Sequence, residues 1–204
     1  MFRNAQYALH HSGSLIASIG IVVATASSLA AEPSFDCAKA KGAVEEMVCK
    51  DAGLAALDRK LAEVYATALR KFKGQNYEDP RPLQRGWVKG RNDCWKAGDM
   101  RRCVERNYRH RIAELQIAYG DFVVPSTITY ACGDFHLATV FYRETNPPTV
   151  VLTPLGHDGT DQVIAFLSPS GSGARYEAAN VSFWEHHGEA MLTWFGEETT
   201  CQIR

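Results

Sequence analysis

The chain has 204 residues and a formal net charge of −1, a length that allows one large domain or two small ones. The near-neutral total hides a division of charge. Residues 32–120 carry 18 Lys and Arg against 13 Asp and Glu, a balance of +5, whereas residues 121–204 carry 3 Arg against 10 Asp and Glu, a balance of −7. Such an acidic half is a poor ligand for nucleic acid and is expected to attract a cationic partner.

The first thirty residues are typical of a secretory signal peptide. Residues 15–29 are small and apolar, and Ser28-Leu29-Ala30 is a suitable cleavage site. The apolar run is too short and too rich in Ala and Ser to favour a retained membrane helix. Cys37 stands seven residues after Ala30, which argues against a lipoprotein anchor. We therefore expect a periplasmic or secreted protein that is not anchored to a membrane.

Six cysteines in an exported chain indicate three disulfides. Six cysteines allow fifteen pairings. The positions favour pairing cysteines that are close in sequence in the N-terminal half, and pairing the two that lie near the ends of the C-terminal third. These pairs are Cys37–Cys49, Cys94–Cys103 and Cys132–Cys201. The alternative is a zinc site, but the chain contains no CxxC spacing, so we predict no metal.

Residues 35–118 have the apolar periodicity of a helical domain. A short helix is expected over residues 43–49, and a longer one from the cap Asp51 to about Phe72, stopped by Gly74. Pro82 suits the first turn of a third helix, whose predicted buried stripe is Leu83, Trp87 and Cys94. A fourth helix is expected between residues 100 and 120, with arginines at positions 101, 102, 106, 109 and 111.

From residue 127 the apolar period changes to two. Runs at 135–141, 150–152, 163–166, 181–183 and 190–194 are predicted strands, separated by turn signals such as Asn146-Pro147-Pro148 and Phe195-Gly196. Seven or eight short strands in this space favour a small antiparallel barrel or sandwich. The predicted fold class is α+β: an N-terminal, disulfide-stapled helical domain followed by a small antiparallel β-barrel over 127–204.

Residues 168–176 break the strand pattern. Pro169, Gly171 and Gly173 surround Ser172, which predicts a tight protruding loop with an exposed hydroxyl at its tip. Tyr176 and Trp184 are expected to anchor the base of this loop.

The C-terminal half resembles the MliC/PliC family of bacterial inhibitors of c-type lysozyme. The matching residues are Tyr130-Ala-Cys132, Phe141-Tyr142, Ser170-Gly-Ser-Gly-Ala-Arg-Tyr176, Phe183-Trp184, Ala190 and Cys201. This resemblance implies an eight-stranded barrel that inserts a loop into the lysozyme cleft. It also implies that Ser172 reaches the two catalytic carboxylates, together with a lysine whose position is held here by His186. An imidazole is only partly charged near neutral pH, so the resemblance is weaker at that position.

The N-terminal half resembles the LprI type, which is also associated with lysozyme inhibition. The matching residues are Phe35-Asp-Cys37, Glu46, Cys49, Leu54, Leu57-Asp58, Tyr65, Gln84, Trp87, Arg91, Cys94, Cys103, Tyr108, Arg111-Ile112 and Leu115. No site residues are implied by this second resemblance.

The predicted function is therefore a secreted protein inhibitor of c-type lysozyme, with no catalytic residues, cofactor or metal. The predicted lysozyme-binding residues are Ser170, Ser172, Arg175, Tyr176 and His186. Arg175 forms either a rim ion pair or a contact to the partner, and the sequence leaves this open, like the oligomeric state. The alternative function is a non-catalytic module that binds peptidoglycan or an envelope protein through the helical domain, and the arginine-rich helix is one reason to consider it.

Two other interpretations of the same stretch are less favoured. A hydrolase would use Ser172 with His186 and Glu185, but a strand-to-helix nucleophile elbow is missing. A metal site would use Glu185, His186 and His187, but neighbouring residues on a strand point to opposite faces.

Overall fold

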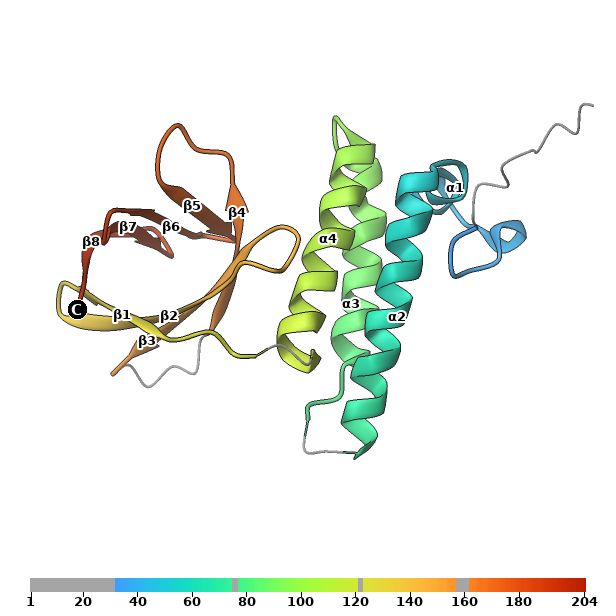
Figure 1. Ribbon diagram of the computed structural model, residues 1–204. Helices are drawn as coiled ribbons and strands as arrows, with labels where there is room; N and C mark the ends of the chain where they lie inside the picture. Colours follow the sequence, from blue (N-terminus) through green and yellow to red (C-terminus); the bar gives the residue numbers. More distant parts are fainter. Residues whose placement is uncertain (1–31, 75–76, 121–122, 157–161) are drawn as a thin grey trace, which may run out of the picture.

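The computed structural model describes residues 32–74, 77–120, 123–156 and 162–204. A group of helices lies beside a β-barrel (Figure 1). The expected signal peptide lies outside the described residues. Within the described ranges, no helix has both the length and the apolar character needed to cross a bilayer.

The helical domain contains α1 (Ala43–Lys50), α2 (Ala52–Gly74), α3 (Arg81–Asn92) and α4 (Met100–Tyr119), with 3-10 turns at Cys37–Lys39 and Asp93–Lys96. The Asp51 carboxylate accepts a hydrogen bond from the Leu54 amide at 3.0 Å and so caps α2 as predicted. Asp99 caps α4 in the same way through the Arg102 amide at 2.9 Å. The predicted stripe on α3 is wrong in part. Leu83 is 63% exposed, and Cys94 lies in the 3-10 turn after the helix.

The core of the helical domain combines apolar side chains with one buried polar network. The Tyr108 hydroxyl donates to Asp58 Oδ1 at 2.8 Å and accepts from Arg91 Nη1 at 2.7 Å. All three side chains are buried, so each satisfies groups that would otherwise lack a partner. The surrounding apolar core is formed by Val44, Val48, Leu54, Leu61, Ala68, Cys94, Val104, Ile112, Leu115 and Tyr119. Disulfides Cys37–Cys49 and Cys94–Cys103 join neighbouring segments of this domain, as expected.

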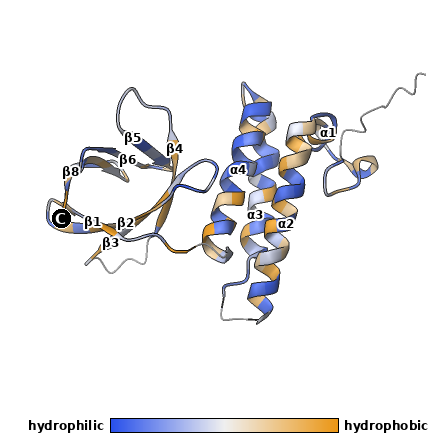
Figure 2. Cartoon of the chain, viewed as in Figure 1, coloured by the Kyte–Doolittle hydropathy of each residue, from blue (hydrophilic) through white to orange (hydrophobic). Residues whose placement is uncertain are grey.

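The C-terminal domain is a closed antiparallel barrel with strands in sequence order, which confirms the predicted eight strands. The strands are β1 (Ile128–Cys132), β2 (Phe135–Tyr142), β3 (Thr149–Leu155), β4 (Val163–Ser168), β5 (Ala174–Ala178), β6 (Val181–His186), β7 (Glu189–Trp194) and β8 (Glu197–Ile203). Closure joins β1 to β8, where Cys132 and Cys201 stand opposite each other and form the third expected disulfide. Figure 2 shows both hydrophilic and hydrophobic residues on the barrel strands, and on β2 the buried positions include Leu137 and Thr139, as expected when alternate side chains point into the barrel.

The up-and-down topology brings the β2–β3, β4–β5 and β6–β7 connections to one end of the barrel. Ser172 and His186 therefore meet at that end although fourteen positions separate them in sequence. The opposite end carries the β5–β6 and β7–β8 turns. The loop containing Ser172 is shorter than predicted, because β5 already begins at Ala174.

The two domains have separate apolar cores, and α4 is the helix nearest the barrel (Figure 1). Contact between them includes the imidazole of His110 on α4, stacked on the ring of Phe166 in β4, with ring centroids 3.6 Å apart. Burial of His110 in this contact, helped by the nearby Arg106 guanidinium, lowers the pKa of the imidazole to about 4.

Candidate functional site

The β4–β5 loop is held in shape by hydrogen bonds to its own backbone. The Ser170 hydroxyl donates to the Gly173 carbonyl at 3.1 Å, closing the loop on itself. The Trp184 indole on β6 donates to the Ser172 carbonyl at 2.8 Å, tying the tip to the neighbouring strand. Both contacts use main-chain acceptors, so they fix the backbone of the tip without occupying the Ser172 hydroxyl.

Gly173 permits the turn into β5. Its φ is +63°, and a Cβ atom there would lie 2.3 Å from the Glu185 carbonyl oxygen. A side chain is therefore excluded by both backbone conformation and space. This close approach brings the loop against β6, and it explains why a glycine follows Ser172.

Ser172 is exposed, and its hydroxyl has no hydrogen-bond partner among the described residues. His186 lies near it, because both side chains line the same shallow hollow, and the His186 ring carbon Cδ2 lies 3.1 Å from the position that a Cβ on the adjacent Gly173 would occupy. The structure thus brings together the two side chains that the sequence pairs at the proposed binding site.

His187 corrects the argument used against a metal site. It does not continue strand β6 but sits in the β6–β7 turn with a φ of +54°. Its ring consequently lies beside that of His186, with centroids 4.2 Å apart, and not on the opposite face. Even so, no group of three or more metal-binding side chains occurs in the described part of the chain.

Two predicted binding residues have other environments. Tyr176 is only 6% exposed and belongs to the barrel core, where burial raises the pKa of its phenol. This burial fits the expected anchoring role, while a contact of Tyr176 with a partner stays a prediction. Arg175 forms an ion pair with Glu177 on the same strand, with Nη2 2.9 Å from Oε1.

Sequence reasoning missed three residues of the site because strand register, not motif spacing, places them there. Met191 on β7 stands directly opposite Trp184, and Glu189 stands opposite both His186 and Gln202. The Gln202 amide donates to Glu189 at 2.6 Å. Together with Ser172 and His187, these side chains line a shallow hollow beside the loop. Met191 is half exposed there, which would add apolar contact area to an interface.

The arrangement does not resemble a hydrolase site. In the described structure Ser172 makes no hydrogen bond to His186, and the Glu185 carboxylate accepts from the Gly188 amide at 2.9 Å. In a hydrolase, the nucleophile would hydrogen-bond to its base, and the base would hydrogen-bond to an orienting acid. The site instead presents the Ser172 hydroxyl next to the His186 imidazole, and both groups can donate and accept hydrogen bonds.

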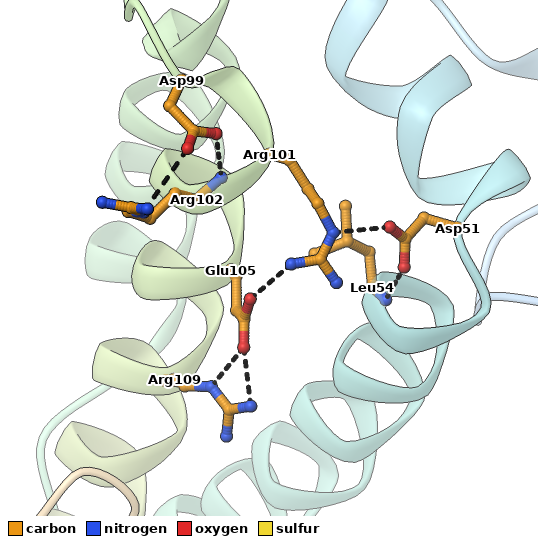
Figure 3. A network of polar contacts seen from close by, with 7 residues as sticks. All are labelled: Asp51, Leu54, Asp99, Arg101, Arg102, Glu105 and Arg109. Atoms are coloured by element: carbon orange, nitrogen blue, oxygen red, sulfur yellow. Dashed lines mark hydrogen bonds and ion pairs between the residues drawn. The ribbon is translucent and has the colours of Figure 1, made fainter.

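Most arginines of α4 are engaged within the helical domain. Figure 3 shows Arg101 joined to both Asp51 and Glu105, Arg109 joined to Glu105, and Arg102 joined to Asp99. Arg109 and Arg101 together lower the pKa of Glu105. Arg111 is buried against Gln84 and Glu114. Because ion pairs within the fold account for four of these five cations, the arginine-rich helix does not favour the alternative of an envelope-binding surface.

Comparison with known proteins gives two findings. Residues 130–200 match the family model described as "Membrane-bound lysozyme-inhibitor of c-type lysozyme". Over 181 residues the chain is 36% identical to "Lipoprotein LprI" of Mycobacterium bovis and of Mycobacterium tuberculosis, covering 88% of this chain and 88% of each relative. The comparison with solved structures found no match.

Proposed function

We propose that this chain, which belongs to the LprI family and carries an MliC-type domain, is an exported protein inhibitor of c-type lysozyme. It would act as a non-catalytic plug, inserting the β4–β5 loop into the active-site cleft of the enzyme. The observation that carries the proposal is the exposed hydroxyl of Ser172, which has no hydrogen-bond partner among the described residues, on a loop whose backbone is already fixed. A loop ordered before binding loses little entropy when the complex forms.

The hydroxyl suits the chemistry of the target. A retaining glycosidase places two carboxyl groups about 5–5.5 Å apart, one protonated and one ionised. One hydroxyl oxygen donates to the ionised group and accepts from the protonated one. Two such O–H···O bonds of about 2.7 Å each, meeting at the hydroxyl oxygen at roughly the tetrahedral angle, span about 4.4 Å between their outer oxygens, which is within reach of carboxyl groups at that separation. Ser172 would thereby occupy both catalytic groups and exclude the sugar.

His186 would supply the second contact. A donor beside the catalytic carboxyls stabilises their ionised form, which opposes the protonation that the general acid requires. The acidic charge of the barrel, −7 over residues 121–204, supports attraction of a cationic enzyme.

The proposal is tested by adding the purified chain without residues 1–30 to a c-type lysozyme in a cell-wall lysis assay. We expect inhibition at micromolar excess. Ser172→Ala should weaken binding at least about tenfold, since hydrogen bonds to charged groups contribute about 1.5–3 kcal/mol each. The matched control is Ser182→Ala, a serine on β6 near the opposite end of the barrel.

Ser182→Ala is expected to change affinity by less than about twofold. Equal losses in the two variants would remove the role assigned to the Ser172 hydroxyl. Absence of inhibition by the unaltered chain would overturn the proposed function itself.

A further inference from the structure

The face that α4 presents to the barrel is a single stripe of one helix. Arg102, Glu105, Arg106, Arg109 and His110 recur at intervals of three and four positions and line one groove with the barrel. The barrel contributes Pro147 from the β2–β3 connection and the segment 166–169, which runs directly into the Ser172 loop. The helical domain therefore touches the barrel at the base of the proposed inhibitory loop.

Phe166 is an unusual residue for the outside of a barrel. Its chain neighbour Ala165 points into the barrel core, so the Phe166 ring points outward. It is nevertheless only 8% exposed, and the near-parallel imidazole of His110, tilted by 7°, lies across it. Face-to-face contact at 3.6 Å excludes water from the space between the two rings.

Residues 167–169 connect this contact to the β4–β5 loop. Leu167 donates its amide to the Pro148 carbonyl at 2.8 Å, Ser168 ends β4, and the loop begins at Pro169. Movement of Phe166 would shift the strand end from which the loop departs. The end of the loop that leads into β5 is held separately, by the close approach of Gly173 to β6 and by the hydrogen bond from Trp184.

We infer that α4 braces the inhibitory loop, with His110 as the positioning residue that holds Phe166 and so fixes the departure of the loop from β4. The inference rests on the proposed function for its consequence in binding, but not for its consequence in the free protein. It assigns to the helical domain a role in orienting the loop of the neighbouring barrel.

The brace requires a neutral imidazole. His110 faces the cations Arg102, Arg106 and Arg109 from α4, together with Glu105, which Arg101 and Arg109 already engage. From β5 it faces Glu177, which pairs with Arg175. With the pKa of stacked His110 at about 4, and that of a released histidine near 6.5, the brace is fully present above about pH 6.5. It is lost as the pH falls through 4.

The test compares His110→Ala and His110→Phe with the unaltered chain. In the free protein, nuclear magnetic relaxation of the Gly171 and Gly173 amides should show greater mobility in His110→Ala and native order in His110→Phe, whose ring can restore the stack. Affinity for a c-type lysozyme at pH 7.5 should fall about fivefold in His110→Ala and stay within about twofold in His110→Phe.

A pH profile separates positioning from general stability. Between pH 7.5 and 4 the unaltered chain should lose affinity relative to His110→Phe, because only the unaltered chain carries the imidazole that becomes protonated. The two proteins are compared at the same pH, since titration of the lysozyme carboxyls affects both measurements equally. Equal order of the glycine amides in all three proteins would overturn the inference. If the unaltered chain binds no lysozyme, the proposed function falls, and the relaxation data alone decide whether the brace exists.

Discussion

At the scale of single residues, the two glycines that flank Ser172 have different structural requirements. Gly173 has a positive φ and approaches the Glu185 carbonyl closely. Gly171 lies outside the left-handed region, and a Cβ atom added there would meet nothing within 4 Å. The sequence motif presents both as similar loop residues, whereas the structure makes only one of them necessary for the fold.

This difference predicts opposite outcomes for two alanine variants. Gly173→Ala should lower the free energy of unfolding of the barrel by about 1–3 kcal/mol through backbone strain and should abolish most inhibition. Gly171→Ala should change stability by less than about 0.5 kcal/mol. Thermal unfolding of both variants checks this, and equal shifts would show that the loop conformation does not depend on Gly173.

At the scale of elements, the helical domain depends on the buried bonds that join α2, α3 and α4. Tyr108 on α4 links Asp58 on α2 to Arg91 on α3, and burial is the main cause that raises the pKa of its phenol. The hydroxyl therefore stays protonated throughout the physiological range and acts as a donor to the carboxylate.

Tyr108→Phe removes this link without changing the ring. It leaves Asp58 Oδ1 without its donor and one Arg91 nitrogen without its acceptor, both in the domain interior. We expect the free energy of unfolding to fall by about 1–3 kcal/mol. Urea titration followed by the helical circular dichroism signal measures it. Tyr65→Phe is the control, since the Tyr65 hydroxyl makes no hydrogen bond in the described part of the chain, and a similar loss there would contradict the assignment.

Periodicity predicts most elements of this fold, and the failures have identifiable causes. The start of α2 at Asp51 and the end of α4 near residue 120 are predicted because caps and helix-stopping residues act locally, whereas the Asp99 cap of α4 is seen only in the structure. Strand β5 is absent from the predicted strands because its five residues directly follow Gly173 and look like part of the loop. Leu83 was assigned to the core of α3 because helical spacing gives a face but does not say how far a short helix is covered.

The candidate site divides in the same way. Ser172 and His186 are predicted from a motif, and barrel topology brings them together. Glu189, Met191 and Gln202 depend on the register between β6, β7 and β8, which no local pattern specifies. The contact of His110 with Phe166 joins residues from two domains, so the apolar periodicity of neither domain predicts it.

At the scale of the whole molecule, charge is separated between the domains that α4 and β4 join. The barrel with the proposed inhibitory loop has a balance of −7 over residues 121–204, and the helical half has +5 over residues 32–120. A cationic enzyme approaching at random is drawn to the barrel and repelled from the helices. The charge distribution therefore favours encounters at the domain that carries Ser172, independently of contacts at the loop.

This separation predicts that salt acts mainly on the association rate. Raising ionic strength from about 0.01 to 0.15 M shortens the screening length from about 30 to 8 Å, so the association rate with a c-type lysozyme should fall about tenfold while dissociation changes little. The double variant Glu197→Gln and Glu198→Gln, at the start of β8 and at the barrel end opposite Ser172, should slow association at low salt without touching the interface. Neutralising Lys60 and Lys73 on α2 should instead speed association at low salt. Stopped-flow measurement of both variants decides the matter, because an association rate indifferent to salt and to these charges would mean that the acidic barrel does not guide the encounter.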